Sequence, residues 1–249
     1  MAKITFLGTA SAVPDRNHQN SHFVVQTESG TVLVDCVGNP IVRLREAGID
    51  PLSITDLVLT HFHPDHVSGV PLLLMDLWLL GRKQPLDIYG LESVLEKFEA
   101  MMDLYEWETW GGFYPVHLHP VTAPDRLVII DRAQLKVLAS KVRHMIPAMG
   151  LRFELPGGTV CYSTDTEPCV EVVRLAEGAD FLIHEASGSM GGHTGAREAG
   201  VIASDAGVKT LILIHYDPIS VPDELKAEAR QSFSGEVIIA KDLMTLPIG

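Results

Sequence analysis

Four side chains that can bind a metal ion lie within six consecutive residues, directly after the short apolar segment 56–59. They are two alternating histidines, an aspartate and a third histidine: His61, His63, Asp65 and His66. Side chains alternate along a strand, so His61 and His63 should point to one side where the strand ends and could share one cation. Asp65 and His66 lie on the turn into the next helix and can diverge toward a second cation. The fold must therefore hold this loop, and any further ligands, at one edge of a sheet.

Histidine nitrogens and carboxylate oxygens suit zinc, with manganese or iron as substitutes, and a catalytic centre leaves coordination positions open for water. The alternative is a polar loop whose histidines cap a helix or lie at the surface. So dense a cluster of metal-capable side chains seldom serves packing alone. The loop therefore predicts a hydrolase that binds two divalent cations, most simply two zinc ions.

The chain favours one soluble α/β domain over residues 1–249, because its length can bury a substantial core and no linker-like tract interrupts the apolar segments. The first six residues run straight into a strand pattern, and the longest apolar stretch, residues 70–80, is too short to span a bilayer. Three cysteines show neither a disulfide framework nor a zinc-knuckle spacing: Cys36, Cys161 and Cys169. We expect a cytoplasmic protein with no signal peptide and no membrane attachment.

The net charge of −13 disfavours broad electrostatic capture of polyanions such as RNA. A pair of bound cations with a local basic rim could reverse the field inside a cleft. Nucleic acid therefore stays open as a substrate, although the composition does not point to it.

Apolar patterns of period two recur along the chain and alternate with amphipathic segments. Strands are expected at residues 3–7, 22–26, 31–35, 56–60, 86–89, 127–130, 135–141, 151–155, 160–163, 181–183, 210–214 and 237–239. Helices are expected at residues 40–47, 67–80, 91–104, 168–176, 196–206 and 222–230. Because strands predominate in two blocks flanked by helices, we expect an α/β fold in which two sheets face each other with helices outside.

An aromatic segment follows the third expected helix and contains Tyr105, Trp107, Trp110, Phe113 and Tyr114. Large aromatic side chains can wall a ligand pocket, but they also dominate hydrophobic cores and subunit interfaces. Cover over the core or an interface is the plainer interpretation, and a pocket wall is the alternative.

If the loop at residues 61–66 holds two cations, further histidines and acids should stand at the ends of later strands, where loops gather at one edge of the sheets. Three residues do so, each after an expected strand: His144, Asp165 and His215. Singly, each would suit a cap or a surface group equally well. Together with the first cluster, they favour a metal centre.

The cluster at residues 61–66 matches the HxHxDH motif residue for residue, and with it the chain resembles the metallo-β-lactamase superfamily. The resemblance implies an αββα four-layer sandwich of two mixed β-sheets flanked by helices. It also implies that His61, His63 and His144 bind one metal ion. A second ion would be bound by Asp65, His66 and His215, and the carboxylate of Asp165 would bridge the two.

Within that superfamily the chain resembles the ribonuclease Z branch over nearly its whole length. Gly8-Thr9-Ala10 with Pro14 and Arg16-Asn17 is similar to the opening of that branch. Residues 182–186 are similar to its HEA motif, and Gly192-His193-Thr194 with residues 196–199 is similar to its HST segment.

The chain departs from that branch in two places. Between His144 and Asp165 it runs through one compact hairpin, where members that process transfer RNA carry a long arm that grips the RNA. The glycine-aspartate-threonine of the family is Thr164-Asp165-Thr166 here, which keeps the ligand but changes the turn. The missing arm and the acidic charge weaken a transfer-RNA assignment without touching the hydrolytic centre.

In the mechanism that the resemblance implies, two cations bridged by water and Asp165 lower the pKa of that water from about 15.7 toward roughly 7, so that hydroxide forms at neutral pH. Asp65 binds metal and orients or deprotonates the water. His193 contacts the phosphate or protonates the leaving oxygen, and Glu185 holds the His193 ring, although both could simply cap. His184 is expected to orient neighbouring groups. The other histidines have surface or structural roles: His18, His22, His117 and His119.

The first hypothesis is a metal-dependent phosphodiesterase that acts on a small diester or an RNA end. The same centre could open lactones, thioesters or sulfate esters, so another hydrolase is the alternative. A noncatalytic metal-binding protein is the third hypothesis, and the complete ligand set argues against it. The aromatic segment and the family resemblance suggest a homodimer.

Overall fold

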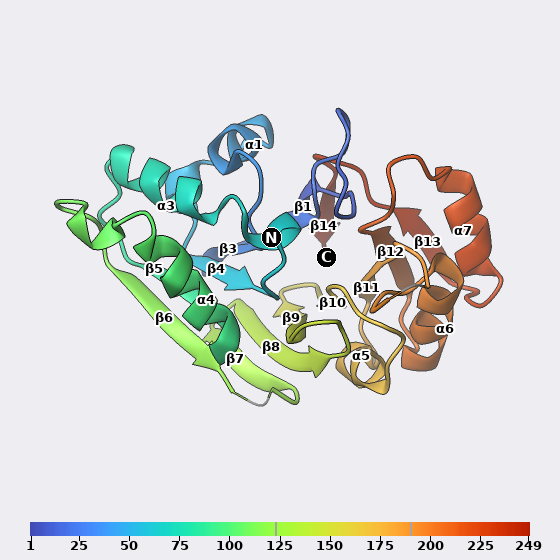
Figure 1. Ribbon diagram of the computed structural model, residues 1–249. Helices are drawn as coiled ribbons and strands as arrows, with labels where there is room; N and C mark the ends of the chain where they lie inside the picture. The colour runs from blue at the N-terminus through green and yellow to red at the C-terminus, as the bar shows by residue number, and fades with distance from the viewer. Residues whose placement is uncertain (123, 190) are drawn as a thin grey trace.

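The computed structural model describes residues 1–122, 124–189 and 191–249, and within these residues the chain forms two seven-stranded sheets. The sheets lie face to face, and helices cover both outer faces (Figure 1). The expected αββα sandwich of two mixed sheets is confirmed. The two ends of the chain meet at the edge of the first sheet, where Ala2 pairs with Ile248.

The first sheet has the strand order β14-β1-β2-β3-β4-β5-β6. Its strands β14, β1, β2 and β3 pair antiparallel, whereas β4, β5 and β6 continue the sheet in parallel. Their bounds are β1 Ala2–Gly8, β2 His22–Thr27, β3 Gly30–Val34, β4 Asp56–Leu59, β5 Leu86–Leu91, β6 Val116–Val121 and β14 Thr245–Ile248.

The second sheet has the order β13-β12-β11-β10-β9-β8-β7. Strands β7 to β10 form an antiparallel meander, and β10 to β13 run parallel. The bounds are β7 Leu127–Arg132, β8 Leu135–Val142, β9 Ala148–Leu155, β10 Gly158–Tyr162, β11 Phe181–Glu185, β12 Thr210–Ile214 and β13 Glu236–Ile239. Between His144 and Asp165 the chain forms only the β9–β10 hairpin, as expected.

Helices α1, α3 and α4 lie outside the first sheet, and α5, α6 and α7 lie outside the second (Figure 1). Among the helices in the described part of the chain, none is long and apolar enough to cross a membrane. The bounds are α1 Pro40–Glu46, α2 Pro64–Val67, α3 Val70–Leu79, α4 Glu92–Asp103, α5 Val170–Ala176, α6 Ala196–Ala206 and α7 Pro222–Arg230.

Alternating side chains of the second sheet serve two separate cores. Along β12, Leu211 and Leu213 face the helices, whereas Ile212 and Ile214 face the first sheet. Because strand side chains alternate, one apolar run can fill both layers. This explains why the buried parallel strands read as continuous apolar runs.

The helix expected at residues 67–80 is wrong at its start, since α3 begins only at Val70; Val67 ends the preceding short helix α2, and the chain breaks between the two helices at Ser68 and Gly69. A tertiary contact causes the break. The backbone nitrogen of Gly69 donates to the carbonyl of Cys36 at 2.9 Å, and a Cβ on Gly69 would lie 2.7 Å from the carbonyl carbon of Val37. Only glycine allows this approach, which fixes α2 close to the end of β3.

The sequence analysis missed β6 and β14, the two edge strands of the first sheet. Both carry a proline, Pro120 and Pro247, which an edge strand tolerates because its outer backbone needs no partner. Their partly exposed side chains also lack a clean apolar alternation.

The aromatic segment covers the first core, as the plainer interpretation predicted. Trp110 stacks on Trp78 of α3 with 5.5 Å between ring centroids, and Phe113 contacts both tryptophans edge-on. Tyr105 remains 56% exposed. Together with the exposed face of α3, Tyr105 and Trp110 border a cavity of about 340 Å³.

We predict that burial of His22 makes the fold sensitive to acid. Its ring is fully buried, with Nδ1 on the carbonyl oxygen of Asn20, and burial lowers its pKa from 6.5 to about 4. The stabilisation is complete above pH 6.5 and is lost as the pH falls toward 4, because the unfolded chain binds a proton first. The loss should reach about 3 kcal/mol. Urea unfolding between pH 7 and 4.5 should show a shallower pH dependence for His22→Gln than for wild type, and parallel curves would contradict the prediction.

Candidate metal centre

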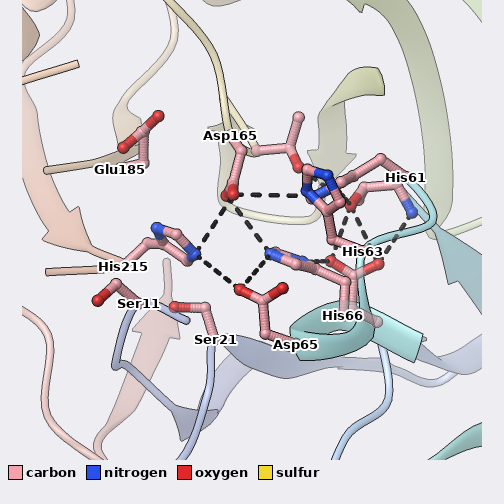
Figure 2. Close-up of polar contacts among 12 residues, drawn as sticks. Ser11, Ser21, His61, His63, Asp65, His66, Asp165, Glu185 and His215 are labelled. Atoms are coloured by element: carbon pink, nitrogen blue, oxygen red, sulfur yellow. Dashed lines mark hydrogen bonds and ion pairs between the residues drawn. The ribbon is translucent and has the colours of Figure 1, made fainter. Parts of the chain in front are cut away.

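The loop after β4 places the HxHxDH cluster at the edge of the sheets. His63 is the N-cap residue of α2, and Pro64 takes the first helical position, where a missing N–H costs nothing. The short helix then holds Asp65 in its first turn and turns His66 inward, where it is fully buried. Figure 2 shows the labelled histidines and both aspartates converging on one space.

The first group of converging ligand atoms belongs to His61, His63, His144 and Asp165, all within 4.8 Å of one another. Nε2 of His144 lies 3.1 Å from Nδ1 of His63, and Nε2 of His61 lies 3.8 Å from Oδ2 of Asp165. His144 arrives from the β8–β9 connection, where its Nδ1 contacts the carbonyl oxygen of Gly192 at 2.8 Å.

The second group consists of Asp65, His66, Asp165 and His215. Nε2 of His215 lies 3.3 Å from Asp165 and 3.5 Å from Asp65, and Nε2 of His66 lies 3.5 Å from Asp165 (Figure 2). Asp165 therefore belongs to both groups. The structure brings together all seven residues in the two sets expected from the sequence, although their binding of metal stays a prediction.

Several buried atoms of this cluster lack a hydrogen-bond partner among the described residues: Nε2 of His61, Nε2 of His66, Nε2 of His215 and Oδ1 of Asp165. A buried polar atom left without a partner costs free energy, and cations would satisfy all four. Nitrogen and carboxylate donors at such short separations fit divalent cations of the zinc type. The residues present thus fit a dinuclear centre.

The charges of the cluster also suit cations. Burial alone would raise the pKa of Asp165, but the charges of His215 and His66 hold it well below its usual range, so the carboxylate is ionised. Burial holds the pKa of His61 well below its usual range, which leaves the ring neutral and able to bind metal. For His66, the carboxylates of Asp165 and Asp35 outweigh burial and raise the pKa, so a cation must displace a proton there.

Strained backbone accompanies the ligands. Thr164 has φ 53° and His215 has φ 54°, both in the left-handed region that non-glycine residues rarely adopt. Thr164 stands where the ribonuclease Z branch has glycine, and its hydroxyl donates to Oγ1 of Thr60 at 3.0 Å. Such strain is typical of sites where the backbone must aim a side chain.

Asp35 contacts a candidate ligand and is a residue of the site that the sequence analysis missed. It is fully buried, contacts Nδ1 of His66 at 2.7 Å, and accepts hydrogen bonds from the backbone nitrogen and hydroxyl of Thr60. That hydroxyl in turn lies 3.1 Å from Nδ1 of His61. Asp35 thus fixes one histidine directly and a second through Thr60. A lone aspartate at the end of a strand gave little signal, apart from its place beside the cluster in a parallel sheet.

We predict that Asp35→Asn weakens zinc binding by about 10- to 100-fold, as is typical for groups that orient metal ligands. An asparagine amide would present N–H to the N–H of His66 and so favour the tautomer that carries its proton on Nε2, the metal-facing atom. Zinc titration with a competing chelator measures the effect. Asp56→Asn is the matched control, since Asp56 is equally buried but binds Arg132. Equal zinc affinity in Asp35→Asn and wild type would refute this role.

His193 and Glu185 form a pair beside the two groups. Nδ1 of His193 lies 2.9 Å from Oε1 of Glu185 and 4.0 Å from Asp165, and its ring stacks on His215 with 5.8 Å between centroids. Glu185 is fully buried and also accepts from the backbone nitrogen of Thr166 and the hydroxyl of Ser187. The hydrogen bond to Glu185 raises the pKa of His193. This contact places Glu185 where it can hold the His193 ring through Nδ1, while a role of the pair in catalysis stays a prediction.

The remaining histidines lie outside the two groups. His184 is buried, with Nδ1 on the carbonyl oxygen of Glu185. His18 contacts Asp15, and His117 and His119 contact Asp87 on the exposed face of β5 and β6. These placements agree with structural roles.

An open cavity of about 490 Å³ leads to the cluster. Besides site histidines and aspartates, it is lined by residues 11–13, Pro64, Met145, Ser187 and Asp217. Among the described residues that line it, none is lysine or arginine.

Comparisons with known proteins agree with this geometry. The model of a family described as anti-Pycsar protein Apyc1 matches residues 2–236. A ribonuclease Z of Methanothermobacter thermautotrophicus is 30% identical over 100% of this chain and 97% of the relative. The metallo-β-lactamase fold protein YhfI of Bacillus subtilis superposes with a TM-score of 0.85 at 26% identity, covering 98% of both chains. The short form of human tRNase Z (ELAC1) superposes with a TM-score of 0.80 at 28% identity, covering 99% of both chains.

The alignment with the Methanothermobacter ribonuclease Z spans 307 positions, more than the 249 residues of this chain. That relative therefore carries segments that are absent here.

Proposed function

This chain belongs to the family of the anti-Pycsar protein Apyc1 and is a metal-dependent hydrolase of the metallo-β-lactamase fold, and on this premise we propose that it cleaves a phosphodiester, in a small diester or at an RNA end, with a dinuclear zinc-type centre. One observation supports this most directly. Seven candidate ligands form two groups that share Asp165, with the His193–Glu185 pair beside them.

In the proposed reaction, two divalent cations would supply Lewis acidity that lowers the pKa of water and offsets charge on the phosphate. Asp65, half-buried and facing His215, orients the attacking water and accepts its proton. His193 offers Nε2 to a phosphate oxygen or to the leaving oxygen, while Glu185 fixes the ring from the other side.

A small diester fits the pocket better than a long RNA. The absence of lysine and arginine from the described lining leaves His193 and the bound cations as the positive groups, and Asp217 adds a negative one. Binding of an RNA backbone normally relies on several basic contacts. The net charge of −13 and the short β9–β10 hairpin support the same choice.

The test is hydrolysis of bis(p-nitrophenyl) phosphate by zinc- or manganese-loaded protein, with Asp65→Ala as the control for contaminating enzymes. Activity that disappears in Asp65→Ala supports the proposal and justifies a screen of cyclic nucleotides and RNA. If two metals are bound per chain but no activity is seen, lactones, thioesters or sulfate esters become the proposed substrates. Failure to bind metal stoichiometrically would revive a noncatalytic role.

We also propose that the chain forms a homodimer through the exposed apolar side chains beside the aromatic segment. Leu72 is 41% exposed and Leu104 is 83% exposed, and Leu72 lines the 340 Å³ cavity with Tyr105. Patches of this kind mark protein interfaces. Sedimentation equilibrium should show a dimer for wild type and a monomer for Leu72→Glu, and a monomeric wild type would refute the proposal. The cytoplasmic location stays a prediction.

A further inference from the structure

The cavity above the candidate metal centre has an apolar part that the proposed hydrolysis does not use. Val13 and Met145 both line it, and they are 76% and 63% exposed. Exposed apolar side chains are unremarkable when scattered singly, but Val13 and Met145 line one cavity together with Ala12 and Pro64, so part of its lining is apolar. Methionine in particular adapts its shape to flat ligands.

Val13 lies on a loop that is anchored firmly at its base. Asp242 accepts a hydrogen bond from the hydroxyl of Thr9 at 2.7 Å and from the backbone nitrogen of Gln19 at 2.8 Å. Ala10 also bridges to Tyr216, the residue after the candidate ligand His215. The loop is therefore held at both ends by Asp242, and before Val13 it also pairs with the chain that follows His215.

The side chain of Met145 is also held in place by its neighbours. It follows His144 directly, and a Cβ on Gly192 would lie 3.0 Å from its Cγ. The backbone of Gly192, held by His144, thus supports the methionine side chain from one side.

We propose that Val13 and Met145 form a subsite for a planar, uncharged ring on the ester group that stays attached to the phosphorus, such as an aryl group or a nucleobase. This rests on the proposed phosphodiesterase function and adds which substituent the site selects. A ring is the occupant that we infer, because Val13 and Met145 line the same cavity as candidate ligands such as His63 and His215, so that a diester bound at the centre has its second substituent within reach of them. Contact with two apolar side chains stabilises a ring over a methyl group by burying more area.

Two diesters with the same leaving group isolate this substituent. Bis(p-nitrophenyl) phosphate retains an aryl group after cleavage, whereas methyl p-nitrophenyl phosphate retains a methyl group, and both release p-nitrophenolate. The ratio of kcat/KM for the aryl over the methyl diester should fall about ten-fold in Val13→Ser and in Met145→Ser. Val201→Ser, an exposed valine on α6, should leave the ratio unchanged. An unchanged ratio in both pocket variants, or an equal loss on both diesters, would overturn the subsite.

A binding measurement distinguishes failure of the subsite proposal from failure of the proposed phosphodiesterase function. If the metal-loaded wild type cleaves neither diester, the phosphodiesterase proposal fails, and calorimetric titration with diphenyl phosphate and dimethyl phosphate still tests the subsite. Tighter binding of diphenyl phosphate that is lost in Val13→Ser and Met145→Ser supports it. Equal binding of the two phosphates to wild type refutes it.

Discussion

Asp165→Asn is expected to abolish diester hydrolysis, by at least about 1,000-fold in kcat, and to leave fewer than two metals bound per chain. Asp165 is the one residue that belongs to both candidate groups, within 4 Å of His61, His66 and His215. A neutral amide removes the negative charge that balances two cations. Because a bound metal contributes several kcal/mol of transition-state stabilisation, loss of one should cost this much. Stopped assays with metal analysis of the same sample measure both quantities.

Two controls make the Asp165 result decisive. Asp205→Asn changes an exposed carboxylate on α6 and should retain activity and both metals. Thermal unfolding of metal-free Asp165→Asn shows whether the variant folds, since the residue is buried. A folded Asp165→Asn variant that binds two metals and turns over normally would contradict the bridging role.

The layers of the fold could be predicted from the sequence because buried strands and helices have recognisable apolar patterns. Strands such as β12, buried on both faces, are continuous apolar runs, and the HxHxDH motif adds the family resemblance. The missed strands β6 and β14 lie at sheet edges, where exposure and proline weaken the pattern. The break between α2 and α3 arises from the contact of Gly69 with Val37, a tertiary event that no local pattern encodes.

The candidate site could be predicted where a metal-binding residue type stands in an uncommon position, such as the end of an apolar strand. A histidine or aspartate after a strand is conspicuous, so His144, Asp165 and His215 could be found and then assembled by the family pattern. Asp35 has the same chemistry, but a single carboxylate at the end of β3 suggests a cap, and only its hydrogen bonds to His66 and Thr60 reveal its task. Val13 and Met145 are ordinary residues until the fold places them in one cavity.

His193→Ala is expected to lower kcat for a diester that releases an alkoxide by about 10²- to 10⁴-fold, the range for loss of a general acid or base, while two metals stay bound. The ring lies beside both groups, but the candidate ligand sets are complete without it, and Glu185 holds its Nδ1. His117→Ala, which removes an exposed histidine on β6, is the control. Full turnover of an alkoxide-releasing diester in His193→Ala would remove the residue from the reaction.

The leaving group decides what His193 does. If its Nε2 protonates the leaving oxygen, cleavage that releases p-nitrophenolate, which departs without a proton, should be nearly insensitive to His193→Ala, whereas cleavage that releases an alkoxide should suffer the full loss. If Nε2 instead donates a hydrogen bond to a phosphate oxygen, both reactions should slow by the same factor, since the charge on that oxygen is common to them. Because Glu185 is fully buried and fixes the ring in either case, Glu185→Gln should reproduce whichever pattern His193→Ala shows, at smaller amplitude.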